Sequence, residues 1–515
     1  MDTARNLIRS SVARTVMALV SAAIAFFMMP FLIGHLGDHW YGVWVLVGSL
    51  AGNYYLLDFG LSAGVTRFVT DRLARGDRDG ANTVISTALC LYGAMALVIV
   101  LIAVLASRAA YLLVPQGPAL PTIRLVILVV GLQYAAEFPF KAFAGVIGSY
   151  LRYDLLMYSR FTSLVLTTGL TVYVIQRGGG IVALAIIGFL GAQVSNVMYL
   201  RIVRWLFPDL RVGLRFASAA VGRELLHYSS WAFAIDVANR LRFRIDSVVI
   251  GGMISAAAVT HYAVGQRIVE TFSDFVYRAT NITTPLFTQH WSRGDYAEIR
   301  RQLLLLTRIN AIVGLFGGGI IVVVGRSFIL RWMGDGFAAS YPVLCVLMAS
   351  MVVQIIGLFG HNVLYAMAKL PRLGVINVVE GVLNLVLSMI FAHFMGIVGV
   401  ALGTALPLLF FRLIVVPLYV VRLVGLSLRQ YYATLGPTCL VTLVYLAACA
   451  LLARPFLALP SYLSVLAVAG IATPLYAAFI PFVAFQRDER RYLRSLLARG
   501  LGVGRPSDRQ PAEPC

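Results

Sequence analysis

The sequence predicts an all-α polytopic membrane protein, and its composition and the pattern of its apolar blocks are the observations behind this prediction. Hydrophobic residues make up 60% of the 515 residues and charged residues only 12%, whereas soluble domains carry about 25% charged residues. The mean hydropathy is +0.85. Blocks of about 20 mostly apolar residues, each long enough to cross a bilayer as a helix, recur along the whole chain.

About 14 such blocks can be placed, in groups of six, six and two. The first is too long for the apolar region of a signal peptide, and no cleavage pattern of small residues follows it, so we interpret it as a membrane span. A basic connector at 204–224 separates the first two groups. The predicted spans lie near 12–34, 40–65, 83–106, 122–148, 158–176, 181–203, 227–253, 258–284, 303–325, 341–367, 373–394, 398–421, 431–452 and 461–485.

An internal repeat supports two matched lobes. Val47-Gly48 recurs as Val264-Gly265, and the octapeptide TDRLARGD from Thr70 recurs at nearly the same offset as TQHWSRGD from Thr288. Because each lobe has six spans, both run the same way across the membrane, as parallel repeats do. The predicted parts are an N-terminal six-helix lobe at 1–210, a C-terminal six-helix lobe at 211–425, two additional transmembrane helices at 426–486, and a basic cytoplasmic tail, partly disordered, at 487–515.

The arginines predict the orientation of the chain. With the N-terminus in the cytoplasm, most of them fall in cytoplasmic loops and in the tail, and the outer loops hold little beyond Arg108, Arg177, Arg326, Arg331 and Arg454. This asymmetry follows the positive-inside rule and places both termini in the cytoplasm. The net charge of +20 therefore indicates membrane orientation, and we expect no nucleic-acid partner.

Several short motifs in about the first 100 residues carry a family resemblance. They are Pro30-Phe31-Leu32, Trp40-Tyr41-Gly42, the LDFGL stretch from Leu57 to Leu61, Thr66-Arg67-Phe68 and Arg75-Gly76-Asp77. The chain resembles the polysaccharide biosynthesis proteins and O-antigen (Wzx-type) flippases of the multidrug/oligosaccharidyl-lipid/polysaccharide exporter superfamily. This resemblance implies two lobes around a central cavity, alternating access, and a polyprenyl-pyrophosphate-linked sugar as cargo in a bacterial inner membrane.

The predicted span at 227–253 carries five charges in its interior. Each costs about 2.5–3.5 kcal/mol at the centre of an isolated membrane helix, so these charges must face one another, a wet cavity or a ligand. Asp236, Arg240 and Arg244 share one helical face, and Arg242 and Asp246 lie on a neighbouring stripe. Pairing along the helix would still leave a surplus cation, which favours an anionic ligand such as pyrophosphate.

Other membrane charges are candidates for pairing or ion coupling. Arg267, Glu270, Asp274 and Arg278 follow at i, i+3, i+7 and i+11, which predicts an ion-pair ladder or an acid that carries H⁺ or Na⁺. The candidate substrate-binding cations are Arg240, Arg242, Arg244, Lys141, Arg267 and Arg278, and the candidate coupling or ion-pair acids are Asp236, Asp246, Glu270, Asp274, Glu137 and Glu380.

Three more expectations concern local contacts. Glu137 and Lys141 have the i, i+4 spacing of an ion pair. Asn377, Glu380, Asn384 and Ser388 form a polar stripe suited to hydrogen bonds between helices. Asp58, near the end of the second predicted span, is interpreted as an interfacial cap or a contact to the following loop.

No catalytic signature was found, so we expect a transporter and not an enzyme. The sequence has no Walker A, HExxH or paired-Cys pattern, which predicts no bound cofactor or metal beyond a coupling ion. The leading hypothesis is a flippase or exporter for lipid-linked oligosaccharide, with membrane lipid, the sugar substrate and other polysaccharide-assembly proteins as partners. A cation-coupled multidrug exporter of the same superfamily and a membrane-embedded glycosyltransferase or polymerase remain the alternatives.

Overall fold

The computed structural model describes residues 2–58, 60–112, 119–227, 245–280, 283–367, 370–459, 461–485 and 489–490. In these ranges the chain is helical and has no strand, which confirms the predicted all-α class. By its internal contacts the chain forms two compact units. Unit 1 comprises Met1–Thr271 with Leu370–Leu408, and unit 2 comprises Phe272–Lys369 with Leu409–Cys515. The lobe boundaries predicted from the sequence stay a prediction.

Within the described residues, eight helices are long and apolar enough to cross a membrane, or nine if one bent pair counts as a span. The chain is therefore a multi-pass membrane protein, and the predicted number of about 14 spans is not confirmed. Two of the eight, Val20–Ala74 and Arg372–Val424, each cover all or most of two predicted spans, because a single residue rather than a loop interrupts the helix between them.

In the first of these long helices that residue is Gly37. A straight helix over α1 (Asp2–Gly52) would be about 77 Å long, more than twice the hydrocarbon core of a bilayer. The helix is instead kinked at Gly37, whose φ of 80° and ψ of 164° suit glycine.

Gly396 breaks α15 (Leu370–Phe410) in the same way, with a φ of 58°. The stretches on either side pack closely, since a Cβ at Gly403 would overlap the backbone of Ser388. The first part of α15, up to Leu408, belongs to unit 1.

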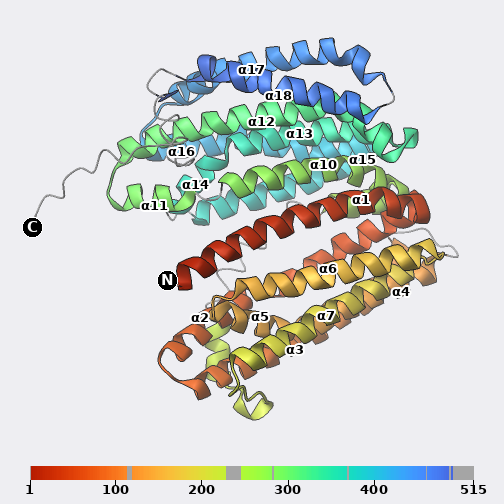
Figure 1. Ribbon diagram of the computed structural model, residues 1–515, viewed down its shortest axis with the longest axis vertical. Helices are drawn as coiled ribbons and strands as arrows, with labels where there is room; N and C mark the ends of the chain where they lie inside the picture. Colours follow the sequence, from red (N-terminus) through yellow and green to blue (C-terminus); the bar gives the residue numbers. More distant parts are fainter. Residues whose placement is uncertain are drawn as a thin grey trace, which may run out of the picture. The chain divides into compact units, whose positions relative to one another are not determined.

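The remaining helices of unit 1 surround one buried apolar cluster. Tyr92, Phe138, Leu61 and Ile85 are fully buried in it, and α3, α4, α6 and α7 run side by side around it (Figure 1). The elements after α1 are η1 (Asn53–Asp58), α2 (Leu61–Ala74), α3 (Arg78–Arg108), η2 (Ala109–Leu112), α4 (Leu120–Glu137), α5 (Phe140–Ser149), α6 (Tyr153–Gln176), α7 (Ile181–Leu206), η3 (Leu214–Phe216), a helix at 219–227, α9 (Asp246–Met253) and α10 (Ala256–Thr280), which continues into unit 2.

Unit 2 contains the two helices predicted near the C-terminus. They are α17 (Leu428–Leu457), which starts with a Ser427–Gln430 capping box, and α18 (Tyr462–Ala484). Both lie along α12 (Figure 1), and Phe316 stacks on Tyr476 with ring centroids 4.2 Å apart. The other elements are α11 (Thr284–Ser292), α12 (Tyr296–Met333), η5 (Asp335–Phe337), α13 (Ser340–Ile356), α14 (Leu358–Ala366), the π-helix η6 (Phe411–Val415) and α16 (Val416–Val424).

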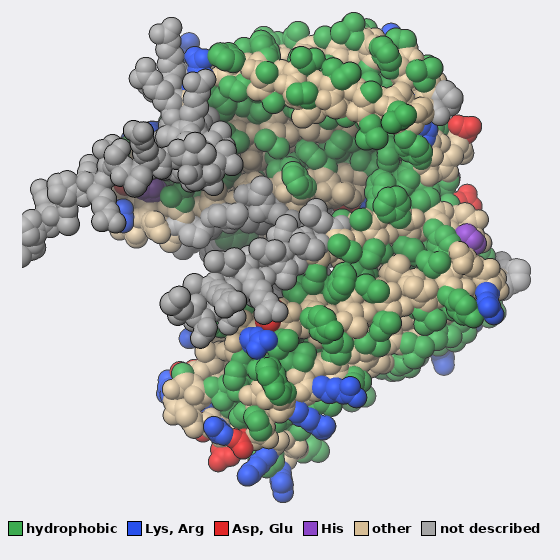
Figure 2. Space-filling view, viewed as in Figure 1, with side chains coloured by type: hydrophobic (Ala, Val, Ile, Leu, Met, Phe, Trp, Pro, Cys, Tyr) green, Lys and Arg blue, Asp and Glu red, His purple; other side chains and the backbone are tan. Residues whose placement is uncertain are grey.

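Apolar side chains cover much of the visible surface (Figure 2). Leu97, Phe394 and Leu452 are 73%, 76% and 75% exposed. A soluble protein rarely exposes so much contiguous apolar surface, whereas lipid contact requires it.

The repeated octapeptides adopt the same local structure. Gly76 and Gly294 have φ values of 73° and 69°, a region that glycine enters at little cost. The next residue caps a helix in both cases: Asp77 accepts a hydrogen bond from the Gly80 N–H at 2.7 Å, and Asp295 accepts one from the Glu298 N–H at 3.0 Å. The sequence repeat is therefore also a structural repeat at these turns.

Replacing Asp295 with alanine should lower the free energy of unfolding by about 1 kcal/mol, because the first turn of α12 loses its side-chain cap. The measurement is thermal unfolding of the purified protein in detergent. Asp79→Ala is the matched control, since Asp79 is an exposed acid in the first turn of α3 whose side chain caps nothing. Equal effects of the two substitutions would contradict the capping role.

Candidate functional site

Unit 1 holds a polar cavity of about 500 Å³ between α1, α9 and α10. It brings together three residues that the sequence singled out, Asp246, Arg267 and Glu270. The other lining residues are Ala25, Met28, Met29, Leu32, Tyr41, Trp44, Val45 and Ser49 of α1, Ser247 of α9, and Ala263 and Gln266 of α10. The cavity therefore joins an apolar wall with aromatic rings to a wall of charged and amide groups.

Helical spacing explains the α10 wall. Ala263, Gln266, Arg267 and Glu270 fall at i, i+3, i+4 and i+7 and so share one face. Arg267 Nη1 lies 3.8 Å from Glu270 Oε2, and the Gln266 amide donates to Glu270 Oε1 at 3.0 Å. The Arg267 and Glu270 side chains are 32% and 50% exposed, and pairs this exposed contribute at most about 1 kcal/mol.

The predicted ladder on α10 does not continue around the cavity. Asp274 is exposed and does not line it, and the Arg278 side chain lies outside the described residues. Asp236, Arg240, Arg242 and Arg244 also lie outside them. Their assignment as cavity acids and cations stays a prediction.

Asp246 is the most deeply buried acid of this cavity, with 5% of its surface exposed. Its Oδ2 accepts hydrogen bonds from the Tyr262 hydroxyl at 2.6 Å and from the Thr404 hydroxyl at 2.9 Å. Its Oδ1 is buried and has no hydrogen-bond partner among the described residues. A buried carboxylate oxygen without a partner is costly, so this atom can hold a proton or a small cation.

Sequence reasoning did not find Tyr262 and Thr404. Tyr262 lies on the next helix, and Thr404 is 158 residues away from Asp246, so no spacing along one helix connects either residue with the acid. A hydroxyl at the start of a predicted membrane span is a weak signal, because most such groups bond to their own helix backbone.

The hydrogen-bond chain continues from Thr404 into the predicted polar stripe. The Thr404 hydroxyl lies 3.4 Å from Asn384 Oδ1, and the Ser388 hydroxyl donates to the same oxygen at 3.1 Å. Asn377, Glu380, Asn384 and Ser388 are all buried. The prediction of hydrogen bonds between helices is confirmed for Asn384 and Ser388, which link the two stretches of α15.

Lys141 forms a separate polar cluster in unit 1. Its Nζ lies 3.5 Å from Asp58 Oδ1, which also accepts a hydrogen bond from the Tyr92 hydroxyl at 2.7 Å. The ammonium group also lies 4.4 Å and 4.1 Å from the ring centres of Tyr55 and Phe138. These ring contacts are cation–π interactions, which help to hold a cation away from bulk water.

Glu137 accepts a hydrogen bond from the Gln133 amide at 3.0 Å and also lies within electrostatic reach of Lys141. The predicted pairing of Lys141 with Glu137 stays a prediction. The backbone keeps helical dihedral angles at Phe138 and Pro139, between α4 and α5. Asp58 joins η1 to α3 and α5 through its contacts with Tyr92 and Lys141.

No group of three or more His, Cys, Asp or Glu side chains in the described ranges could hold a metal ion.

Comparison with known proteins shows to which family the chain belongs. The model of the family described as polysaccharide biosynthesis protein matches residues 54–342, more than half of the chain. The chain belongs to this family. The resemblance predicted from the first 100 or so residues is thereby confirmed.

This polysaccharide biosynthesis protein is similar to two curated relatives. It is 22% identical to the uncharacterized membrane protein EpsK of Bacillus subtilis over 504 residues, which cover 94% of this chain and 97% of EpsK. It is also 22% identical to the probable low-salt glycan biosynthesis flippase Agl15 of Haloferax volcanii over 205 residues, which cover 39% of this chain and 43% of Agl15.

Among solved structures, the family member resembles the lipid II flippase MurJ in an inward closed conformation. The TM-score is 0.72 with 12% sequence identity, and the match covers 96% of this chain and 99% of the MurJ chain. At this identity the likeness shows a shared fold, and the multi-pass helical architecture agrees with it.

Proposed function

We propose that this protein is a flippase or exporter that moves a polyprenyl-pyrophosphate-linked oligosaccharide across the bacterial inner membrane for O-antigen, capsule or exopolysaccharide assembly. The observation that carries the proposal is the polar cavity of unit 1, enclosed by helices of a chain from the polysaccharide biosynthesis protein family. The similarity to Agl15, a probable glycan biosynthesis flippase, and to the lipid II flippase MurJ supports the same class of activity.

The chemistry of the cavity suits a sugar headgroup. Hydroxyl-rich cargo loses several kcal/mol of hydration in hydrocarbon, on the order of 2–7 kcal/mol per unpaired polar group, so its path needs hydrogen-bonding partners. Ser49, Ser247 and Gln266 provide such partners, and the rings of Tyr41 and Trp44 provide a flat apolar surface next to them. In a site of this mixed composition the polar groups fix the orientation of the ligand, and the apolar wall buries part of its surface.

Cations are proposed to hold the pyrophosphate. Arg267 lines the cavity, and its 3.8 Å separation from Glu270 leaves guanidinium donors available to a phosphate. The planar guanidinium matches phosphate oxygens in a two-pronged geometry. Arg240, Arg242 and Arg244 remain proposed partners of the same group, while Lys141 lies in the separate cluster with Asp58.

Asp246 is proposed as the site at which H⁺ or Na⁺ drives transport. A bound cation would supply the missing partner of Oδ1, and its loss would leave a buried charge uncompensated. Cation and cargo binding would thus favour different conformations, which is what alternating access requires.

Both termini are proposed to be cytoplasmic, as the loop arginines predict.

The proposal is tested in a strain that lacks the gene and is complemented with variants. Arg267→Ala and the double variant Arg240→Ala/Arg244→Ala should reduce surface polysaccharide at least about tenfold, a loss of about 1.4 kcal/mol in cargo binding. Lipid-linked oligosaccharide should accumulate on the cytoplasmic side. Arg301→Ala is the control, because Arg301 is an exposed residue of α12 paired with Glu298.

Normal polymer output from the Arg267 and Arg240/Arg244 variants at normal protein levels would contradict the cation assignment. Increased sensitivity of the deletion strain to cationic drugs, with unchanged polymer, would favour a multidrug exporter. Polymer extension by the purified protein without movement of lipid-linked sugar would favour a glycosyltransferase or polymerase.

A further inference from the structure

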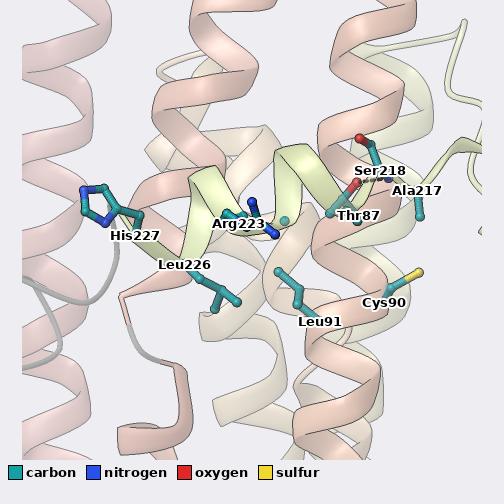
Figure 3. A pocket seen from close by; sticks show the side chains of 10 residues that line it. Thr87, Cys90, Leu91, Ala217, Ser218, Arg223, Leu226 and His227 are labelled. Carbon is teal, nitrogen blue, oxygen red and sulfur yellow. Dashed lines mark hydrogen bonds between the residues drawn. The ribbon is translucent and has the colours of Figure 1, made fainter.

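A second cavity of about 720 Å³ lies in unit 1, between the N-terminal half of α3 and the segment that follows α7 (Figure 3). Its wall includes Thr87, Cys90 and Leu91 of α3 and Arg223, Leu226 and His227 of the helix at 219–227. Figure 3 shows this helix crossing α3 rather than running along it. The cavity shares no lining residue with the polar cavity near Asp246.

Side-chain hydrogen bonds from α3 fix the segment that forms the cavity wall. The Asn82 amide donates to the Asp209 carbonyl at 3.0 Å and accepts from the Arg211 N–H at 2.9 Å. The Ser218 N–H donates to the Thr87 hydroxyl at 3.0 Å. Leu225 is fully buried in the apolar cluster of unit 1. Several specific contacts therefore hold one wall of this open cavity in place.

An apolar track leads out of the cavity along α3. Cys90, Ala94, Leu97, Leu101 and Leu105 recur at i, i+4, i+7, i+11 and i+15 and share one helical face. Leu97, Leu101 and Leu105 are 73%, 58% and 58% exposed, as expected for side chains in contact with lipid. The track is about 22 Å long, which exceeds half of the roughly 30 Å hydrocarbon core.

Positive charge gathers at the other end of this track. Arg223 lies on the cavity wall, is exposed, and makes no ion pair with any described residue. The segment from 201 to 224 carries five arginines against two acids, and one of the acids, Asp209, is paired with Arg78. An anionic group is the partner that this charge excess favours.

We propose that this cavity binds an anionic phospholipid of the membrane leaflet that faces the arginine-rich loops. Arg223 binds the headgroup phosphate, and one acyl chain passes Cys90 and Leu91 and follows the exposed face of α3. A guanidinium without an ion pair among the described residues, an apolar wall and a continuous track to the lipid-facing surface together fit this occupant. The bound lipid would fasten residues 204–227 to α3, and this role does not depend on the cargo.

The experiment uses the full chain, purified in detergent and mixed with phosphatidylglycerol that carries a photoactivatable group on one acyl chain. After illumination, adducts should map to α3 between Thr87 and Leu105 and to residues 217–227. Arg223→Gln should reduce their yield about fivefold, the factor that corresponds to about 1 kcal/mol per arginine at an anionic surface. Arg215→Gln is the control, since Arg215 is exposed on the same segment but does not line the cavity.

A second variant tests the cavity without removing a charge. Cys90→Trp fills the space beside Leu91 and should abolish adducts near Thr87, while thermal unfolding in the absence of added lipid stays that of a folded protein. Phosphatidylcholine with the same photoactivatable chain should label the site at least threefold less than phosphatidylglycerol. Inorganic phosphate at millimolar concentration should not compete, which distinguishes a lipid from a free phosphate.

Equal labelling by the two lipids, or unchanged labelling of Arg223→Gln, would overturn the proposal. So would adducts confined to other helices. Capture of the chain's own residues 491–515 by a photo-crosslinker attached at Cys90 would assign the cavity to the C-terminal tail instead.

Discussion

Replacing Asp246 with asparagine is expected to abolish the response of the protein to its coupling ion while leaving it folded. The amide keeps an oxygen for the hydrogen bonds from Tyr262 and Thr404 but removes the negative charge that a proton or Na⁺ would neutralise. A ligand that binds the native state raises the melting temperature. The wild-type melting temperature should therefore rise when Na⁺ replaces choline at equal ionic strength, or with acid if the ion is H⁺.

The Asp246→Asn variant should show neither response, and polymer output in complemented cells should fall at least about tenfold, equivalent to about 1.4 kcal/mol. Asp274→Asn is the matched control, because Asp274 is an exposed acid of α10 that does not line the cavity. If the Asp246 variant keeps the ion response and the output of the wild type, the coupling role of this carboxylate is wrong.

The two hydroxyl partners of Asp246 allow a finer version of the same experiment. Tyr262→Phe and Thr404→Val each remove one donor to Oδ2 and keep the charge. Loss of a hydrogen bond to a charged group costs about 1.5–3 kcal/mol, so both variants should unfold at lower temperature. They should still respond to the ion, because Oδ1 is unchanged, and this separates the positioning residues from the ion-binding group.

Asp246, Arg267 and Glu270 were predictable from the sequence because a charge inside an apolar block is costly, whatever the fold around it. That all three line one cavity depends on how α9 and α10 pack. Helical spacing predicted only that Arg267 and Glu270 share one face of α10. Thr404 could not be found, since it reaches Asp246 from a distant part of the chain. No local pattern encodes such a contact.

The way the chain turns between neighbouring apolar blocks could not be predicted from hydropathy, which marks the blocks alone. Gly37 and Gly396 redirect the chain at one residue each, because glycine enters backbone conformations that other residues avoid.

Gly42 is the position where a single added methyl group is expected to damage the fold most. It lies on α1 against the start of α10, where a Cβ would overlap the carbonyl oxygen of Ala256 and lie 2.5 Å from its carbon. The Thr260 hydroxyl fixes the same contact by donating to the Asp38 carbonyl at 2.5 Å. Because backbone atoms cannot move aside as a flexible side chain can, Gly42→Ala must separate the two helices.

Overpacking of this kind costs about 1–3 kcal/mol, and Gly42→Val should cost more than Gly42→Ala. Gly48→Ala is the matched control: it lies on the same stretch of α1, and its added Cβ meets nothing within 4 Å. That variant should be neutral or stabilised by up to about 1 kcal/mol, since alanine favours a helix over glycine. Thermal unfolding in detergent measures both, and similar melting temperatures for the two alanine variants would contradict the close approach of α1 to α10.

Gly42→Ala is also expected to change the shape of the polar cavity. Tyr41 and Trp44 flank Gly42 on α1, while Ala263 and Gln266 face them from α10, so a separation of the helices changes the distance between the aromatic and the polar wall. Gly42→Ala should therefore reduce polymer output even at a temperature where the protein remains folded, whereas Gly48→Ala should not. Full output from folded Gly42→Ala would mean that transport does not depend on the spacing of these two walls.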